Sequence, residues 1–486
     1  MSEQTSDSAV ETTPGGPRGT GSSSGERASS FSLDLDRRDV RAAVRGYFDR
    51  LRSGEPGALP SVLGLIVLGL IFALVSDRFL SANNIGNLPG QGAYIAIIAM
   101  GLVFVLLLGE IDLAAGTTGG ICAGAAAQAL NSNGLRHGIP GAGGLFWILI
   151  IAMLASAALG FYLRAITGPI VVLLGVAVTL TGLDSHPVFA IILAIGIGAA
   201  VGIFAGWLVA SVGIPSFIVT LALFLAWQGL LLFLLNSQPI GVNGYPFWYG
   251  LAHNNMSPLG SWIFTIVTVG GYLAYTIVKS LRAQRRGLSA DTLQLVLARG
   301  GLLAVVAVVI TALANQNRNT NPFKVIQGLP WALTVPITLM IICTIALTKT
   351  TWGRHLFATG GNEEAARRAG INVTHIKVTA FTIGSSFGAL GGVFLASATG
   401  GVQLDLGSGN ILLFAVAAAV IGGTSLFGGR GKPRDAIIGA LVIVIIPNGI
   451  GLRPSLPASY QNLITGAVLL VAAAVDALSR RRSQAR

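Results

Sequence analysis

Charged residues are scarce in this chain of 486 residues: they make up 10% of it, whereas hydrophobic residues make up 53%. An ordinary soluble domain carries roughly 25% charged residues, so the chain lacks the polar surface that would cover a water-exposed globule. Apolar stretches of about 20 residues, the length of helix that crosses a bilayer, recur along it. The sequence therefore predicts an integral membrane protein with several spans, surrounded by membrane lipid.

Cysteine and histidine are also few. The two cysteines, Cys122 and Cys343, lie inside apolar runs, where a thiol acts as a small hydrophobic side chain. The five histidines are scattered, and neither an HExxH nor a CxxC motif occurs. We therefore expect no disulfide framework and no metal site.

Acidic residues are outnumbered by basic ones, 19 to 31, which gives a formal net charge of +12. Such an excess is found in nucleic-acid-binding proteins, but also in the cytoplasmic loops of membrane proteins. Here the basic residues cluster just outside apolar runs, as at Lys279 and Arg282 and in the run 480–482. This placement favours the membrane interpretation, so no nucleic-acid partner is expected.

The apolar stretches predict an all-α fold, a polytopic transmembrane helical bundle of about 12–14 spans. Residues 1–57 are rich in Ser, Gly and Thr and are predicted to be a disordered polar cytoplasmic tail. A transmembrane domain is expected over 58–479 and a basic cytoplasmic tail over 480–486. The fourteen candidate spans are 59–77, 91–108, 112–130, 145–163, 165–182, 188–210, 215–236, 261–279, 296–314, 330–348, 376–398, 411–427, 435–452 and 460–478.

The charge of the loops predicts the orientation of the bundle. The loop 236–261 carries no Lys or Arg and holds Tyr245, Trp248 and Tyr249, aromatic residues that suit an outer membrane interface. The loop after Lys279, the segment 360–373, the stretch GGRGKPR and the C-terminal tail are basic and are expected in the cytoplasm. Both termini are therefore predicted to be cytoplasmic.

Two series of glycines recur at every fourth residue. Small residues at this spacing let helices approach closely in lipid, where packing rather than the hydrophobic effect drives helix association. We predict helix packing at both series, although a chain with 65 glycines also places some of them at this spacing without such a role. The series are Gly384, Gly388 and Gly392, and Gly198, Gly202 and Gly206.

The segment GGNEEAARRAGINV, residues 360–373, lies between two apolar runs and predicts a short cytoplasmic helix. Asn362 is a good N-cap, and Gly370 suits the left-handed residue that ends a helix. The acids fall in the first turn and the arginines in the last, which favours both the helix dipole and i,i+4 pairing, and the alanines leave one side narrow. Because two turns of helix are marginal alone, we expect this helix to dock on a partner. The predicted docking residues are Gly361, Asn362, Glu363, Glu364, Ala365, Ala366, Arg367, Arg368, Gly370 and Ile371.

The segment GEIDLAAG interrupts a long apolar region with two acids, Glu110 and Asp112. A charge at the bilayer centre is costly and usually functional, and Gly109 and Gly116 would break a helix there and free its backbone groups. On this interpretation Glu110, Asp112 and Gly116 line a translocation path. The alternative is a turn between two spans at the membrane interface.

The glycine-rich segment 422–434, GGTSLFGGRGKPR, contains Gly431 followed by Lys432. A P-loop requires GxxxxGK[ST], so that backbone amides cradle phosphate and a hydroxyl reaches magnesium. Here Leu426 stands at the position of the first glycine and Pro433 follows the lysine, so no nucleotide site is predicted. A cytoplasmic turn beside the predicted helix is expected instead, made of Gly428, Gly429, Arg430 and Gly431.

Several of these segments occur together, in this order, in a known family. ATGGNEEAARRAGINV, VIGGTSLFGGRGK and IPSFIVTLALFLAWQGL resemble segments of the permease subunits of monosaccharide ABC importers, the ribose and xylose group. GEIDLAAG resembles the GxxDLSxG segment of that family, with Ala114 in place of the serine. The resemblance covers most of the chain from about residue 60 onward. The basic cytoplasmic loop and the extra spans before residue 348 favour the xylose-type branch.

The chain also departs from this family. Hydrophobic residues occupy 412–414, where acids are common, and Gln228 stands where arginine is frequent. The segment 131–187 has no counterpart that we can place. The expected fold is unaffected by these differences, but the identity of the sugar is left open.

The resemblance implies an ABC-importer permease fold and a transport subunit rather than an enzyme. The segment 361–371 would be the coupling helix, which sits in a cleft of the ATP-binding subunit. The chain would form the path for a monosaccharide such as xylose or another pentose, in the cytoplasmic membrane of a bacterium. It would bind no cofactor, since ATP and Mg belong to the partner ATPase. Expected partners are that ATPase, an extracytoplasmic sugar-binding protein and a second copy of the permease.

Two other classes remain open at this point. An ion- or proton-coupled secondary transporter uses intramembrane ionisable residues as relays, and Glu110 with Asp112 would serve. A non-transporting scaffold or regulator is the third class. Neither alternative explains the capped segment 362–370, which favours the ATP-driven importer.

Overall fold

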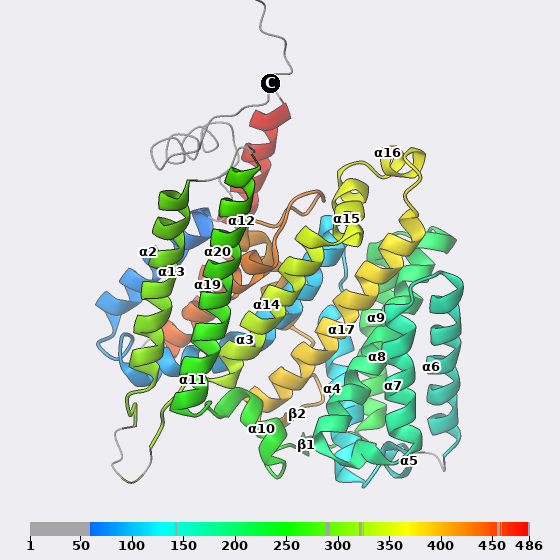
Figure 1. The fold of residues 1–486 in the computed structure, drawn as a ribbon. Coiled ribbons are helices and arrows are strands. Elements are labelled where there is room, and N and C mark those ends of the chain that lie inside the picture. Colours follow the sequence, from blue (N-terminus) through cyan, green and yellow to red (C-terminus); the bar gives the residue numbers. More distant parts are fainter. Residues whose placement is uncertain are drawn as a thin grey trace, which may run out of the picture.

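The computed structural model describes residues 59–140, 143–286, 292–319, 323, 325–453, 457 and 459–484. These residues form a bundle of helices (Figure 1), and the strands among them are two residues each: β1 (Ile240–Gly241) pairs antiparallel with β2 (Gly401–Val402). The predicted all-α fold is confirmed. The predicted tail 1–57 lies outside the described residues.

Each of the fourteen predicted apolar segments contains a helix. By length and composition, nine helices of the described part of the chain are long and apolar enough to cross a membrane, and four apolar helices are shorter. The number of crossings therefore stays a prediction. The nine are α3 (Ala82–Leu107), α6 (Gly144–Tyr162), α8 (Pro187–Trp207) with the π-helix η2 (Leu208–Val212), α9 (Ser216–Leu234), α11 (Pro258–Thr265) with η3 (Ile266–Gly270) and α12 (Gly271–Arg285), α13 (Leu293–Ala314), α14 (Trp331–Lys349), α17 (Val373–Thr399) and α19 (Pro433–Gly451).

The remaining helices are short or less apolar. The last of them, α20, continues past residue 479 to Gln484, and the predicted boundary between the transmembrane domain and the basic tail stays a prediction. These helices are α2 (Leu59–Val75), α4 (Ala115–Asn131), α5 (Leu135–Gly138), α7 (Thr167–Leu180), the 3₁₀ turn η1 (Leu183–Ser185), α10 (Pro246–His253), α15 (Thr351–Gly361), α16 (Glu363–Arg368), α18 (Asn410–Gly422) and α20 (Ser459–Gln484).

Helix α17 lies at the centre of the bundle, between two hydrophobic cores (Figure 1). One core is built from α4, α6, α7 and α8, the other from α3, α14, α18 and α19, and α17 contributes side chains to both. The segment 131–187 had no counterpart in the family that the sequence resembles. In the structure it supplies α6 and α7, and both helices pack on α8. On the opposite side of the bundle α12 and α13 pack on each other (Figure 1).

The two glycine series bring neighbouring helices against α17. A Cβ atom added at Gly202 of α8 would lie 2.5 Å from the carbonyl oxygen of Phe381 in α17. A Cβ atom added at Gly388 of α17 would lie 2.7 Å from the carbonyl oxygen of Ala115 in α4. Any larger residue would push these backbones apart, which is the close approach that small residues permit in lipid. Of the other members, Gly198 and Gly206 also face α17, Gly384 faces α3, and Gly392 contacts Gly119 of α4.

We expect the substitution Gly388→Ala to lower the free energy of unfolding by about 1–3 kcal/mol, the usual cost of overpacking a well-packed site. Gly301→Ala is the matched control, because Gly301 also lies within a helix, α13, and nothing lies within 4 Å of an added Cβ atom there. Thermal unfolding in detergent measures both variants. Equal effects of the two substitutions would show that the contact at Gly388 is not tight.

The loops that were predicted to be cytoplasmic and the loop that was predicted to be outer lie at opposite ends of the bundle. Figure 1 shows α16 and the C-terminal ends of α12 and α20 at one end, and α10, β1 and β2 at the other. This grouping matches the predicted division between the basic loops and the loop 236–261. The prediction for Trp248 is wrong, however: the side chain is fully buried, and its indole N–H donates to the carbonyl oxygen of Val393 at 2.8 Å. The reason is that α10 packs back on α17, so its tryptophan fills the core instead of facing a membrane interface.

Candidate functional site

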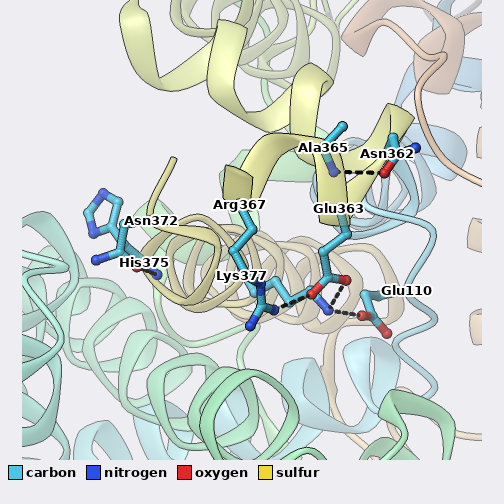
Figure 2. Close-up of polar contacts among 8 residues, drawn as sticks. All are labelled: Glu110, Asn362, Glu363, Ala365, Arg367, Asn372, His375 and Lys377. Atoms are coloured by element: carbon cyan, nitrogen blue, oxygen red, sulfur yellow. Dashed lines mark hydrogen bonds and ion pairs between the residues drawn. The ribbon is translucent and has the colours of Figure 1, made fainter. Parts of the chain in front are cut away.

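The helix predicted from GGNEEAARRAGINV forms with the expected ends. The side-chain oxygen of Asn362 accepts a hydrogen bond from the backbone N–H of Ala365 at 2.9 Å and so caps α16 (Figure 2). Gly370 has a φ of +82°, the left-handed conformation that ends a helix without strain when the residue is glycine. Helix α17 begins shortly after, capped in the same way by Asn372, whose side-chain oxygen accepts from the N–H of His375 at 3.0 Å.

The outer surface of α16 is charged and exposed. Arg367 pairs with Glu363 at 3.0 Å, and Arg368 pairs with Glu364 at 3.1 Å, both at the predicted i,i+4 spacing. Exposed pairs of this kind contribute only a few tenths of a kcal/mol each, so they shape the surface more than they stabilise the fold. The helix therefore keeps a free outer face that a second protein could contact.

We had expected Ala365, Ala366 and Ala369 to lie together on one narrow side of α16. The structure does not place them together. Ala366 is buried under the helix, with 4% of its surface exposed, whereas Ala365 and Ala369 face outward. A six-residue helix makes less than two turns, and its anchoring to the bundle uses Ala366. The outer face is therefore formed by the charged side chains together with the two exposed alanines.

A lysine that the sequence analysis did not single out joins α16 to the predicted path segment. The Nζ atom of Lys377, in the first turns of α17, lies 2.8 Å from a carboxylate oxygen of Glu363 and 2.9 Å from one of Glu110 (Figure 2). Its side chain is only 11% exposed. We call Glu110, Glu363 and Lys377 the Lys377 cluster. A lone cation one turn inside an apolar helix demands a carboxylate partner, and that signal was available in the sequence.

The cluster keeps Glu363 ionised. Partial burial raises the pKa of its carboxyl, but the hydrogen bonds and charges of Lys377 and Arg367 outweigh burial and leave the pKa below its usual range. A carboxyl whose pKa is lowered by folding stabilises the fold above its unfolded pKa and loses that contribution as the pH falls through the folded pKa. The cluster is therefore intact at neutral pH and weakens in acid.

The segment GEIDLAAG forms the turn that joins α3 to α4 and the first residues of α4. That this turn lies between two spans at the membrane interface stays a prediction. Gly109, with a φ of +77°, follows the end of α3, and a carboxylate oxygen of Asp112 accepts from the N–H of Ala114 at 2.9 Å just before α4. The expected helix break at Gly116 is wrong, because this residue lies in the first turn of α4 and contacts the carbonyl group of Gly407. A role of Glu110, Asp112 and Gly116 in a translocation path stays a prediction.

The glycine-rich turn packs against both of these segments. The N–H of Gly429 donates to the carbonyl oxygen of Leu107, at the end of α3, at 2.9 Å. A Cβ atom added at Gly428 would lie 2.7 Å from the carbonyl oxygen of Gly360 and 2.9 Å from the backbone nitrogen of Gly109. The turn is closed by the N–H of Ser425, which donates to the carbonyl oxygen of Arg430 at 2.9 Å, and by Gly431, which packs against Thr424.

Three segments that are far apart in the sequence thus meet at one end of the bundle. They are the α3–α4 turn, the α15–α16 corner and the glycine-rich turn 428–431. The sequence analysis placed the second and third segments side by side, but assigned the first to a separate site. Within the described residues, no group of three or more His, Cys, Asp or Glu side chains is placed to hold a metal ion.

Loss of the cap should weaken α16 without changing its charge. We expect Asn362→Ala to destabilise this helix by about 1 kcal/mol, the usual cost of removing an N-cap oxygen, which corresponds to about fivefold weaker association with any partner that requires the formed helix. Asn362→Asp keeps an accepting oxygen and should bind like the unaltered chain. Surface plasmon resonance with the expected partner ATPase measures the affinity of both variants. An equal loss of affinity in Asn362→Ala and Asn362→Asp would show that the cap does not contribute to docking.

A bundle in which nine helices of the described residues are long and apolar enough to cross a membrane is the architecture of a multi-pass membrane protein. The family described as branched-chain amino acid transport system / permease component matches residues 170–473. The chain belongs to this family of permease components.

Similar proteins cover nearly the whole chain. The xylose transport system permease protein XylH of Escherichia coli K12 is 30% identical over 452 residues, which are 92% of this chain and 98% of the relative. XylH of Haemophilus influenzae is 30% identical over 423 residues, 87% of this chain and 96% of the relative. The ribose import permease protein RbsC of Bacillus subtilis is 28% identical over 432 residues, 89% of this chain and 95% of the relative. No solved structure matches the chain.

Proposed function

We propose that this chain is the membrane-spanning subunit of an ATP-driven importer of a monosaccharide, with xylose or another pentose as the first candidate. The similarity to XylH over 92% of the chain carries this proposal, because it includes both the bundle and the α16 end. The family description names branched-chain amino acids, but relatives that align over nearly their full length are named for xylose and ribose. A sugar is therefore the better supported substrate class, and a permease component of this family is not a secondary transporter.

We propose further that α16 is the coupling helix and docks on a separate ATPase. Its exposed charged face supplies the docking surface. The Lys377 cluster carries movement of α16 to α17 and to the α3–α4 turn, because Lys377 of α17 pairs both with Glu363 of α16 and with Glu110 of that turn. ATP and Mg would be held by that partner, since the glycine-rich turn lacks the P-loop residues. No catalytic role is assigned to this chain.

The remaining parts of the assembly follow the resemblance to sugar importers. We propose a permease homodimer in the bacterial cytoplasmic membrane, with both termini on the α16 side and an extracytoplasmic sugar-binding protein on the side of α10. The concentration of basic residues at the α16 end supports this orientation. The exposed apolar side chains of α9 and α13 are available to lipid or to the second copy.

Reconstituted transport tests the proposal. Proteoliposomes that contain the permease and its ATPase, supplied with the binding protein, should take up radiolabelled xylose or another pentose only when ATP is enclosed, and uptake should persist after a proton uncoupler is added. Leucine serves as the contrasting substrate, given the family description. Uptake of leucine but of no monosaccharide, or uptake that the uncoupler abolishes, would overturn the proposal.

A further inference from the structure

A hollow on the surface of α12 includes no residue of α16 or of the Lys377 cluster. It has a volume of about 520 Å³ and is lined by side chains from the last four turns of this helix. The C-terminal end of α12 lies at the α16 end of the bundle (Figure 1), yet α12 packs on α13 rather than on α16 or α17. The lining residues are Ala274, Tyr275, Val278, Lys279, Arg282, Ala283 and Arg286.

The lining changes from apolar to basic along the helix. Ala274, Tyr275 and Val278 come first, toward the middle of the bundle, and Lys279, Arg282 and Arg286 follow toward its end. At 1.5 Å of rise per residue, the basic stretch extends roughly 10 Å along the axis, a length comparable to a lipid headgroup region. A phospholipid has the same order of groups. Its acyl chain would lie on the apolar part of the hollow, and its headgroup phosphate would lie among the basic side chains.

The charged side chains among the described residues that line the hollow are all basic. Helix α12 contains no acidic residue, and Lys349, at the end of the neighbouring α14, lies with its Nζ atom 5.0 Å from the centroid of the Tyr275 ring. Val278 and Tyr275 are 43% and 50% exposed, so they present apolar surface outward. Basic hollows beside transmembrane helices at the cytoplasmic side bind anionic headgroups, because the phosphate replaces the water around the cations.

We propose that this hollow binds an anionic phospholipid, with the headgroup phosphate held by Lys279, Arg282 and Arg286. The lipid is preferred over a protein partner because the apolar half of the hollow lies within a helix that is long and apolar enough to cross a membrane. A bound lipid would fix the outer hairpin of α12 and α13 in the membrane. The proposal stands apart from the transport function, since the hollow shares no residue with α16 or the Lys377 cluster.

Native mass spectrometry of the purified full chain in detergent tests it with phosphatidylglycerol and phosphatidylcholine as probes. Phosphatidylglycerol should bind more tightly than phosphatidylcholine, and Arg282→Gln should weaken it about fivefold, since a basic residue near an anionic lipid contributes about 1 kcal/mol. The triple variant Lys279→Gln/Arg282→Gln/Arg286→Gln should lose the preference. Arg285→Gln is the matched control, because Arg285 is exposed on the same helix but does not line the hollow. Arg282→Lys keeps the charge and should bind as before.

Three results would overturn the proposal. Equal losses for Arg282→Gln and Arg285→Gln would show that net charge and not the hollow is responsible. Binding of the deacylated headgroup glycerophosphoglycerol as tightly as the lipid would show a site for soluble phosphates. Loss of phosphatidylglycerol when the partner ATPase is added would assign the hollow to a protein interface instead.

Discussion

Permease that carries Arg367→Glu and Arg368→Glu is expected to bind its ATPase at least about a hundredfold more weakly than the unaltered chain. The two side chains are 64% and 79% exposed at the outer face of α16, where a partner would meet them. Like charges that are placed opposite each other across an interface cost several kcal/mol. The same change places like charges at i,i+4 within α16, but that destabilises the helix by only a few tenths of a kcal/mol per pair. Loss of docking should therefore dominate, and co-purification of the complex measures it.

Two controls separate docking from helix stability. Arg285→Glu reverses one exposed charge at the same end of the bundle, away from α16, and should leave the complex intact. The exchange Glu364→Arg/Arg368→Glu restores an ion pair within the helix while it reverses the surface, so it should still weaken docking. A fully assembled complex with the double arginine variant and normal transport-coupled ATPase activity would contradict the assignment of α16.

Lys377→Met is expected to uncouple the permease and to lower its free energy of unfolding by about 3 kcal/mol. Removal of one partner from a largely buried ion pair leaves the other charge uncompensated, which costs about 3–5 kcal/mol. The lower end applies because the side chain of Glu363 is 42% exposed and water screens it, although that of Glu110 is only 18% exposed. Thermal unfolding and sugar-stimulated ATPase activity of the reconstituted complex measure the two effects.

A second substitution distinguishes stability from coupling. Lys377→Met/Glu110→Gln removes the uncompensated carboxylate and should recover part of the lost stability, since replacing both members of a buried pair costs less than replacing one. Coupling should stay impaired, because α16 would no longer be tied to the α3–α4 turn. Lys349→Met removes an exposed lysine from α14 together with its contact to the Tyr275 ring, and should lower stability by no more than about 1 kcal/mol. Full coupling in the double variant would show that the cluster is only structural.

Local chemistry made α16 and the bundle predictable. The start of α16 follows from Asn362, whose side chain bonds to the backbone N–H of a residue three positions later. Its end follows from Gly370, which adopts a left-handed backbone conformation without strain. The apolar segments follow from the length of a membrane span. Packing at Gly388 was likewise indicated by spacing, since a period of four residues places glycines on one helix face.

Long-range contacts could not be predicted in the same way. Lys377 meets Glu110 only because α17 passes the end of α3, and nothing local to either residue specifies that pairing. The outer-interface prediction for Trp248 failed for a related reason, since an aromatic residue suits a membrane interface and a core equally well until the fold places α10 on α17. Neither the sequence nor the fold identifies the sugar. The apolar helices do not present a set of polar side chains that would select one monosaccharide by its hydroxyl groups.

Site-specific crosslinking tests the central claim most directly. In a Cys122→Ala/Cys343→Ala background, a single cysteine introduced by Arg368→Cys and carrying a short photoreactive maleimide should capture the ATPase subunit in the assembled complex. The same probe introduced by Arg136→Cys, within α5 at the opposite end of the bundle, should not capture it. Capture from position 136 with none from position 368 would contradict the account.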